Sequence, residues 1–251
     1  TEDIYGFLMY SGTVRGNLWS AKARKLSAIK AFFKFLTVKR KLLEVNPAID
    51  IESPKPKKSL PKVLSAEEAM LLLDTIKNDK ESKTVVRDYA IVTLFLNCGM
   101  RVSELVGIDL ADIDRELRSL RVVGKGNKER IVYLNDACRY ALGDYITERS
   151  QHMEEKITTP ALFLSGRGQR ISVKTVQWLV YKYLDLAGLG SKHYSVHKLR
   201  HTAATLMYQS GHVDVRVLKD ILGHEQLNTT QIYTHVSNES MEKAMTQNPL
   251  A

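Results

Sequence analysis

A proline-rich basic segment at residues 53–62 constrains the fold of this 251-residue chain more than any other feature. The segment reads Ser-Pro-Lys-Pro-Lys-Lys-Ser-Leu-Pro-Lys. Its prolines remove backbone donors and favour extended conformations, so the segment cannot form a helix. We therefore predict a basic linker at 53–62, which separates a first domain at 1–52 from a second domain at 63–251.

The excess positive charge lies almost entirely before and within this linker. Residues 1–62 hold 13 Lys and Arg against 5 Asp and Glu, which accounts for +8 of the chain's net charge of +9. Such segregation indicates a polyanionic partner, although a solvated basic helix without a ligand would have the same charge. The candidate contacts to a nucleic-acid backbone are seven lysines: Lys22, Lys30, Lys34, Lys55, Lys57, Lys58 and Lys62.

The composition excludes several classes of protein. Hydrophobic residues make up 44% of the chain, which is ordinary for a globular protein, and no apolar run approaches the roughly 18 residues of a membrane span. Without a signal-peptide pattern, we expect a cytoplasmic protein with no membrane partner. Cys98 and Cys138 lack metal-ligand spacing, so we interpret them as reduced packing residues; a disulfide or a catalytic thiol is the alternative.

Helical periodicity dominates both predicted domains. Residues 21–41 place Leu26, Ile29, Phe33 and Leu36 on one stripe, which predicts a helix. After the linker, the capping box Ser65-Ala-Glu-Glu opens a helix that continues through about Lys77.

A helix at 88–97 precedes Gly99, which allows a tight turn, and Ser103 could open the next helix.

The second domain should also contain one small β structure. Residues 119–123 and 130–134 are rich in β-formers, and the glycine-containing segment 124–128 between them is typical of a hairpin loop. From residue 136 onward the patterns are helical. We therefore predict a mainly α fold with a small antiparallel β-hairpin or sheet.

One predicted helix start combines two side chains suited to an anion. With Ser195 as N-cap, His197 and Arg200 fall in the first turns, where free N–H groups and the helix dipole favour negative charge. A metal site is the rival interpretation, since His193, His197 and His201 are spaced by four residues. However, an H-E-x-x-H pattern and a nearby acidic ligand are both missing, so we predict no metal. A purely structural histidine remains a further alternative.

Four other residues could take part in chemistry at a phosphate. Arg101 follows the Gly99 turn, and Lys125 sits at the hairpin tip; each could also be an ordinary surface residue. Gly223 should end a helix immediately before His224, and Tyr233 should lie on another capped helix nine residues later. A tyrosine becomes a useful nucleophile only when neighbouring cations favour its phenolate or a base takes its proton. Tyrosines are more often packing residues, and the chain has eleven.

Taken together, these segments resemble the tyrosine recombinases, most closely the Xer-type enzymes and the related phage and transposon integrases. The resemblance covers about residues 62–240, in the family's order. Its motifs are Cys98-Gly-Met-Arg101-Val-Ser-Glu-Leu-Val-Gly107, Gly124-Lys-Gly-Asn-Lys-Glu-Arg130, His197-Lys-Leu-Arg200-His201, Leu222-Gly-His224 and Tyr233-Thr-His-Val236.

The resemblance implies a two-domain, C-shaped clamp and a role for each matching residue. Arg101 and Arg200 would hold the non-bridging oxygens of the scissile phosphate, and His224 would donate to the same group. Tyr233 would attack to give a 3′-phosphotyrosyl bond. Lys125 would protonate the leaving 5′-oxygen, and His197 would assist proton transfer. The arginines supply the charge that a metal would otherwise supply, so no cofactor is expected.

The same resemblance implies double-stranded DNA as partner and no small-molecule substrate. Recombination would proceed through a Holliday junction in a tetramer, formed by one kind of subunit or with a related recombinase. A type IB topoisomerase-like enzyme and a catalytically silent DNA-binding regulator are the alternatives. Residues 1–52 would form a core-binding domain shorter than the family's usual four helices, which suggests N-terminal truncation.

Overall fold

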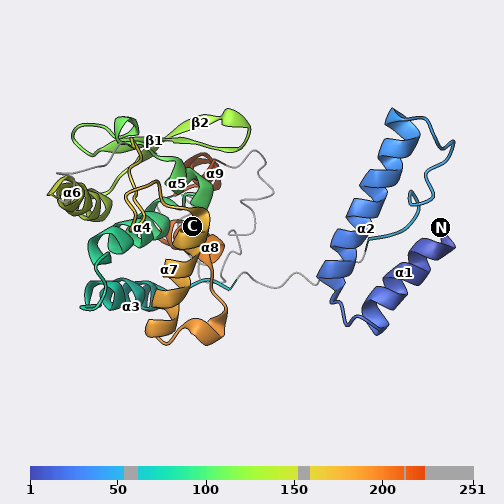
Figure 1. Cartoon of the computed structure of the whole chain (residues 1–251), viewed down its shortest axis with the longest axis horizontal. Helices are drawn as coiled ribbons and strands as arrows, with labels where there is room; N and C mark the ends of the chain where they lie inside the picture. Colours follow the sequence, from blue (N-terminus) through green and yellow to red (C-terminus); the bar gives the residue numbers. More distant parts are fainter. Residues whose placement is uncertain (54–61, 152–158, 212, 224–251) are drawn as a thin grey trace, which may run out of the picture. The chain divides into compact units, whose positions relative to one another are not determined.

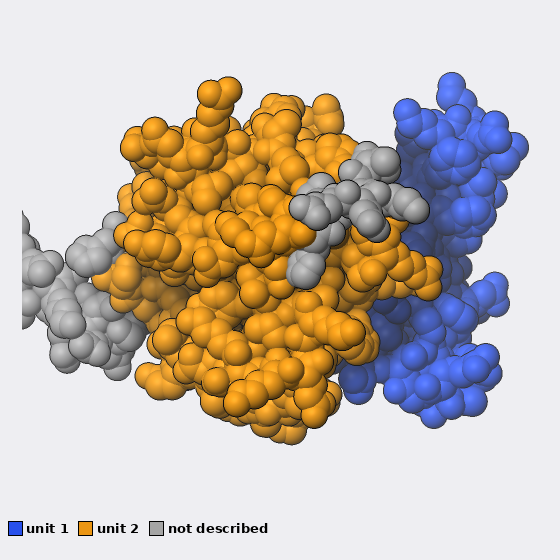
Figure 2. All heavy atoms as spheres, turned by 60° about the vertical axis from the view of Figure 1, so that its left-hand side comes forward, with its two compact units in different colours: residues 1–60 blue, residues 61–251 orange. Residues whose placement is uncertain are grey.

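The structure is a computed structural model that describes residues 1–53, 62–151, 159–211 and 213–223. The chain forms two compact units, Thr1–Leu60 and Pro61–Ala251, which Figure 2 colours blue and orange. Most of the predicted linker, including Lys55, Lys57 and Lys58, lies outside the described residues. The assignment of the units as a core-binding and a catalytic domain stays a prediction, as does the clamp shape.

The first unit is a helical hairpin of α1 (Glu2–Thr13) and α2 (Trp19–Lys34), followed by a short π-helix (Phe35–Lys39). Leu26 is fully buried, and Ile29 and Phe33 pack against the same small core, so the predicted stripe does face the interior. The predicted α-helix was too long at its C-terminal end. Thr37 explains part of this difference, because its hydroxyl donates to the carbonyls of Phe33 and Lys34 and so competes with regular α-helical bonds.

Three of the candidate DNA-binding lysines, Lys22, Lys30 and Lys34, lie on α2. Lys30 Nζ lies 3.5 Å from the Ile49 carbonyl oxygen, and Lys34 is exposed. Lys62, at the start of the second unit, is also exposed. Their contact with DNA stays a prediction.

The second unit is built around the apolar helix α4 (Val85–Cys98), which packs against α3, α6 and α8. Ser65 and Glu68 form the predicted capping box of α3, which is Ala66–Lys77. The other helices, visible in Figure 1, are α5 (Val102–Gly107), α6 (Asp136–Gln151), α7 (Val173–Leu186), α8 (Val196–Gln209) and α9 (Val215–Leu222). Short 3₁₀ turns occur at Leu110–Asp112 and Gly190–Lys192.

The predicted hairpin is present as the antiparallel pair β1 (Ser119–Val123) and β2 (Glu129–Tyr133), joined by a 3₁₀ turn at Lys125–Asn127. The second strand begins one residue earlier than the β-rich run indicated. Figure 1 places this hairpin at the edge of the second unit opposite α3. Leu120, Val122 and Val132 face the core, while Ile131 and Tyr133 are exposed, as expected for a half-buried strand pair.

The turn between α4 and α5 is partly as predicted. Gly99 ends α4 in the left-handed conformation, with φ of 59°. The prediction that Ser103 opens the next helix is wrong, because α5 already begins at Val102 with Arg101 as its N-cap residue. Glu104 explains this start: its carboxylate accepts a 2.7 Å hydrogen bond from the backbone N–H of Arg101 and so satisfies a free donor of the helix.

Cys98 and Cys138 are both buried and reduced, with their Sγ atoms 3.7 Å apart. The neighbouring Cys98 thiol and burial raise the pKa of the Cys138 thiol, so its reactive thiolate is suppressed.

Within the described residues, no helix has the length and apolar composition needed to cross a bilayer.

Candidate active site

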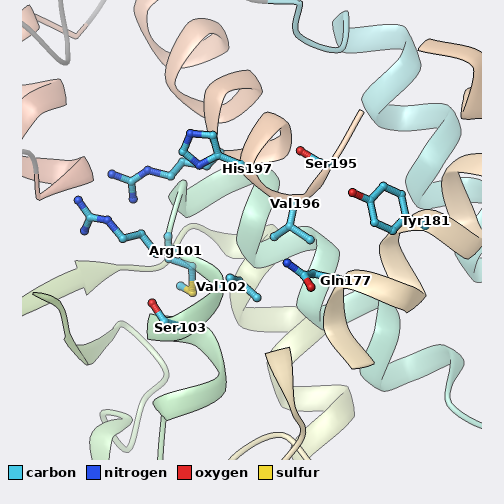
Figure 3. A pocket seen from close by; sticks show the side chains of 10 residues that line it. Arg101, Val102, Ser103, Gln177, Tyr181, Ser195, Val196 and His197 are labelled. Carbon is cyan, nitrogen blue, oxygen red and sulfur yellow. The ribbon is translucent and has the colours of Figure 1, made fainter. Parts of the chain in front are cut away.

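Arg101, His197 and Arg200 come together at one cleft of about 430 Å³. Arg101 comes from the start of α5, whereas His197 and Arg200 come from the first turns of α8. In Figure 3, Arg101 and His197 project on one side, and Gln177 and Tyr181 of α7 form the opposite wall. The remaining lining residues are Met100, Val102, Ser103, Ser195 and Val196. Two guanidinium groups at a common cleft make the site cationic.

Arg200 is only 3% exposed, and backbone carbonyls hold its guanidinium in place. Nη1 donates to the Gly99 carbonyl over 2.6 Å, and Nη2 donates to the Leu222 carbonyl over 2.7 Å. Arg200 therefore connects the α4–α5 turn to the end of α9. Because carbonyl groups have no net charge, these two bonds position the guanidinium without neutralising it.

Arg101 is held from two sides while about a third of its side chain stays exposed. Nη1 donates to Oε1 of Glu104 over 2.7 Å, and Nη2 donates to the Gly223 carbonyl over 3.0 Å. A planar guanidinium fixed at two points is suited to a tetrahedral oxyanion, since its remaining N–H groups keep a defined direction.

Glu104 is fully buried and is shared between two arginines. Arg130 of β2 contacts both carboxylate oxygens, with Nη1 at 2.7 Å from Oε1 and Nη2 at 3.1 Å from Oε2. Burial alone would raise the pKa of Glu104, but hydrogen bonds from Arg130 and from Arg101 lower it below the ordinary value. Glu104 is therefore an ionised carboxylate beneath the cleft.

The C-terminus of α9 receives a different arginine at each of three consecutive carbonyls. Arg130 Nε donates to Ile221 over 3.2 Å, while Arg200 and Arg101 donate to Leu222 and Gly223. Cations at a helix C-terminus interact favourably with its dipole and satisfy its free carbonyls. Gly223 ends α9 with φ of 63°, as the sequence predicted. These contacts fix the residue that directly precedes His224.

The two histidines of α8 pack edge to face, with ring centroids 4.5 Å apart. Loss of hydration lowers the pKa of His197, and the charges of Arg200, Lys198 and Arg101 lower it further. Loss of hydration is the main cause that lowers the pKa of His201 to about 4, and the electrostatic interaction with His197 is the second. Both imidazoles are therefore neutral at pH 7, and a neutral imidazole can accept a proton.

The described structure brings together half of the predicted catalytic set. The side chain of Lys125, together with His224 and Tyr233, lies outside the described residues, and their roles stay predictions. In the part of the chain that the structure describes, no three His, Cys, Asp or Glu residues are grouped to hold a metal ion.

Glu104 and Arg130 were missed as members of the site. Both lie inside the motifs given above, and the sequence pattern could have identified Arg130. On a short strand, Arg130 and Val132 share one face, and Ile131 lies on the other. The face that holds Arg130 points toward α5, so a charged residue there needs a buried partner.

Comparison with known proteins gives the family. Residues 62–240 match the phage integrase family. The chain belongs to this family. It is 48% identical over its full 251 residues to a tyrosine recombinase XerC from Caldanaerobacter subterraneus subsp. tengcongensis, of which it spans 69%. The chain is thus a tyrosine recombinase, an enzyme that cleaves and rejoins DNA.

Solved structures confirm the mainly helical fold. A crystal structure of XerA recombinase has a TM-score of 0.64 at 30% identity, covering 98% of this chain and 82% of that one. A XerH site-specific recombinase bound to a palindromic difH substrate in a post-cleavage complex has a TM-score of 0.80 at 24% identity, covering 97% of this chain and 72% of that one. The Xer-like resemblance predicted from the motifs is therefore confirmed.

Proposed function

We propose that this recombinase cleaves double-stranded DNA by attack of Tyr233 on one phosphodiester, which forms a 3′-phosphotyrosyl intermediate. The observation that carries this proposal is the convergence of Arg101, Arg200 and His197 at one cleft, with both arginines bonded to the carbonyls just before His224. A cleft with this charge suits a phosphoryl group whose oxygens gain negative charge in the transition state.

In this mechanism, Arg101 and Arg200 hold the two non-bridging oxygens. Their anchors on backbone carbonyls and Glu104 fix the forks before DNA binds, so little reorganisation is needed at the moment of reaction. Lysine could not replace them equally well, because a single ammonium lacks the planar fork.

The remaining roles concern protons. His197, neutral at pH 7, accepts or relays the proton of the attacking phenol, and His224 donates to the phosphoryl oxygens. Lys125, in the turn of the hairpin, protonates the departing 5′-oxygen. The arginines provide the positive charge, so the proposed reaction uses no cofactor.

The phosphotyrosyl bond keeps the energy of the broken diester, so a 5′-hydroxyl of another strand can attack it without ATP. Two such exchanges, through a Holliday junction, give recombinant duplexes. We propose that a tetramer on two DNA sites carries this out in the cytoplasm, composed of this chain alone or with a related recombinase. The basic first unit, with Lys22, Lys30 and Lys34 on α2, contacts the DNA backbone.

A nicked suicide duplex tests the nucleophile, because loss of a short fragment after cleavage traps the covalent adduct. Tyr233→Phe should bind the duplex normally and form no adduct. Tyr181→Phe is the informative comparison, since Tyr181 lies in the same cleft, and this variant should keep the adduct. Adduct formation by the Tyr233→Phe protein would refute the assignment.

A second assay separates recombination from topoisomerase activity. The wild-type protein is incubated with supercoiled plasmids that carry one or two copies of a target site. Paired sites should give joined products. Relaxation alone, without joined products from paired sites, would contradict recombination and support the topoisomerase alternative.

A further inference from the structure

Among the three described arginines of this network, Arg130 alone does not line the cleft, although it contacts Glu104 and the same helix end as Arg101. Its side chain is 15% exposed and lies between Glu104 and the end of α9. On β2 it pairs with Val122, within the hairpin whose turn carries Lys125. Arg130 thus joins three elements that border the site: the hairpin, α5 and α9.

We propose that Arg130 is a positioning residue for strand cleavage, which holds Glu104 so that Arg101 keeps its charge and its direction for the phosphate. This inference rests on the proposed function of Arg101. Arg130 itself acts through Glu104 and the α9 carbonyls, and has no contact with DNA in the proposed reaction.

The hydrogen bonds of Glu104 supply the first argument. The carboxylate accepts four hydrogen bonds: two from Arg101, through its backbone N and Nη1, and two from the fork of Arg130. Four is about the number of acceptor positions of a carboxylate, so Glu104 is saturated. Loss of Arg130 would leave both oxygens short of donors in a buried place, where an unsatisfied charge is costly.

The charges supply the second argument. Arg101, Arg130 and Glu104 form a cluster of two guanidinium groups and one carboxylate, with a net charge of +1. Without Arg130, Glu104 and Arg101 would form a neutral pair. The Arg101 fork would then turn toward Glu104 to satisfy the vacant oxygen positions, away from Gly223 and from the phosphate. Removal of the buried Arg130 should therefore reduce the interaction of the more exposed Arg101 with the phosphate.

Close packing supplies the third argument. A Cβ on Gly223 would lie 3.1 Å from Cδ of Arg130, and a Cβ on Gly124 would lie 3.4 Å from Oε1 of Glu104. Glycines on two sides therefore make room for this ion pair. Nε of Arg130 also holds the Ile221 carbonyl, so the same side chain fixes the helix end that precedes His224.

The test compares Arg130→Gln with Arg121→Gln. Arg121 lies on the adjacent strand of the same hairpin, but on its exposed face, where it pairs with Asp112 and Glu129. Both substitutions remove one positive charge from the hairpin, so an effect of charge alone should be equal in the two. We expect Arg130→Gln to lower the rate of adduct formation about a hundredfold and Arg121→Gln to change it less than about threefold. DNA affinity should change little in both.

A rescue experiment distinguishes positioning from general structural support. The double variant Glu104→Gln with Arg130→Gln removes the unbalanced carboxylate. Its two new amides can pair with each other, while the single amide oxygen introduced at position 104 accepts from one of the two Arg101 donors, the backbone N–H or Nη1. This variant should recover at least about tenfold of the rate lost in Arg130→Gln. In an Arg101→Ala background, Arg130→Gln should slow adduct formation less than it does in the wild-type protein, because only the contact of Arg130 with the Ile221 carbonyl is then lost from the site.

Arg130→Lys provides a test if Arg130→Gln does not fold. Lysine keeps the charge but cannot hold both carboxylate oxygens and the Ile221 carbonyl, so an intermediate rate about tenfold below wild type is expected. Full adduct formation by folded Arg130→Gln or Arg130→Lys, or a double variant slower than Arg130→Gln, would overturn this inference. A wild-type protein that forms no adduct would instead refute the proposed function.

Discussion

The guanidinium of Arg200 donates to the carbonyl oxygen of Leu222 over 2.7 Å, although the two residues are 22 positions apart in the chain. This bond joins the second residue of the proposed phosphate clamp to the last turn of α9. A second bond to Gly99 ties the same side chain to the turn before Arg101. Arg200 is therefore both a member of the site and a part of its framework, and its substitution should affect activity and stability together.

Arg200→Lys should abolish most cleavage, with adduct formation reduced about a hundredfold or more, because lysine cannot hold two carbonyls and a phosphate oxygen together. It should also lower the free energy of unfolding by about 1–3 kcal/mol through unsatisfied buried carbonyls. Arg149→Lys is a matched control, since Arg149 is also buried and donates to a carbonyl, that of Ala161. This control should lose stability but retain cleavage per folded molecule; equal loss of cleavage in both variants would contradict a specific role for Arg200.

Gly223→Ala should impair both stability and cleavage. Gly223 has a positive φ, which costs an L-residue about 1–2 kcal/mol, and its new Cβ would press on Arg130 at 3.1 Å. Gly188→Ala provides the control, because Gly188 also has a positive φ, of 72°, but has open space around it. Urea unfolding should show a similar backbone cost in both, whereas the adduct assay should detect a loss only in Gly223→Ala. Unchanged cleavage in Gly223→Ala would argue against a fixed α9 end.

Folding stability should fall as the pH drops from about 7 toward 4. The folded-state pKa of His201, about 4, lies below the ordinary value of about 6.5, so the unfolded chain binds more protons in this range. The lowered pKa of His197 acts in the same direction. Between pH 7 and pH 5, the free energy of unfolding in urea should fall by about 1 kcal/mol more in the wild-type protein than in His201→Asn, since solvent partly screens this incompletely buried imidazole. A pH dependence identical in the two proteins would contradict this assignment.

DNA affinity should depend steeply on salt, and part of that dependence should come from α2. Replacing Lys30 and Lys34 by alanine should reduce the slope of log affinity against log salt by about 2, since each phosphate contact contributes about 0.9. Lys182 and Lys192 are suitable controls, because Asp79 and Glu68 already pair with them. Their replacement by alanine should leave the slope nearly unchanged. A salt slope that stays the same after loss of Lys30 and Lys34 would count against an α2 interface.

The sequence alone allowed local features of the fold to be predicted where a single segment determines them. The Ser65 capping box, the left-handed glycines at 99 and 223 and the hairpin at 119–133 depend on neighbouring residues, and the structure agrees. The start of α5 was misplaced because Glu104, three residues ahead, satisfies the Arg101 N–H and so removes the need for a serine cap.

The framework of the site could not be predicted in the same way. Motifs identify Arg101 and Arg200 as residue types, but the partners that hold them come from elements distant in sequence. Gly99 lies 101 positions from Arg200, and Gly223 lies 122 positions from Arg101. Contacts of this kind depend on tertiary packing, and carbonyl acceptors leave no trace in side-chain composition.

The alternation of residues along the hairpin has a consequence for how such enzymes can diverge. One face of its strands is committed to the interior through Val122, Arg130 and Val132, whereas Arg121, Ile131 and Tyr133 face outward. Substitutions can accumulate on the outward positions without any cost to the ion pair behind them. The outward positions of the hairpin can therefore change their contacts with other molecules while the ion pair of Arg130 and Glu104 is kept.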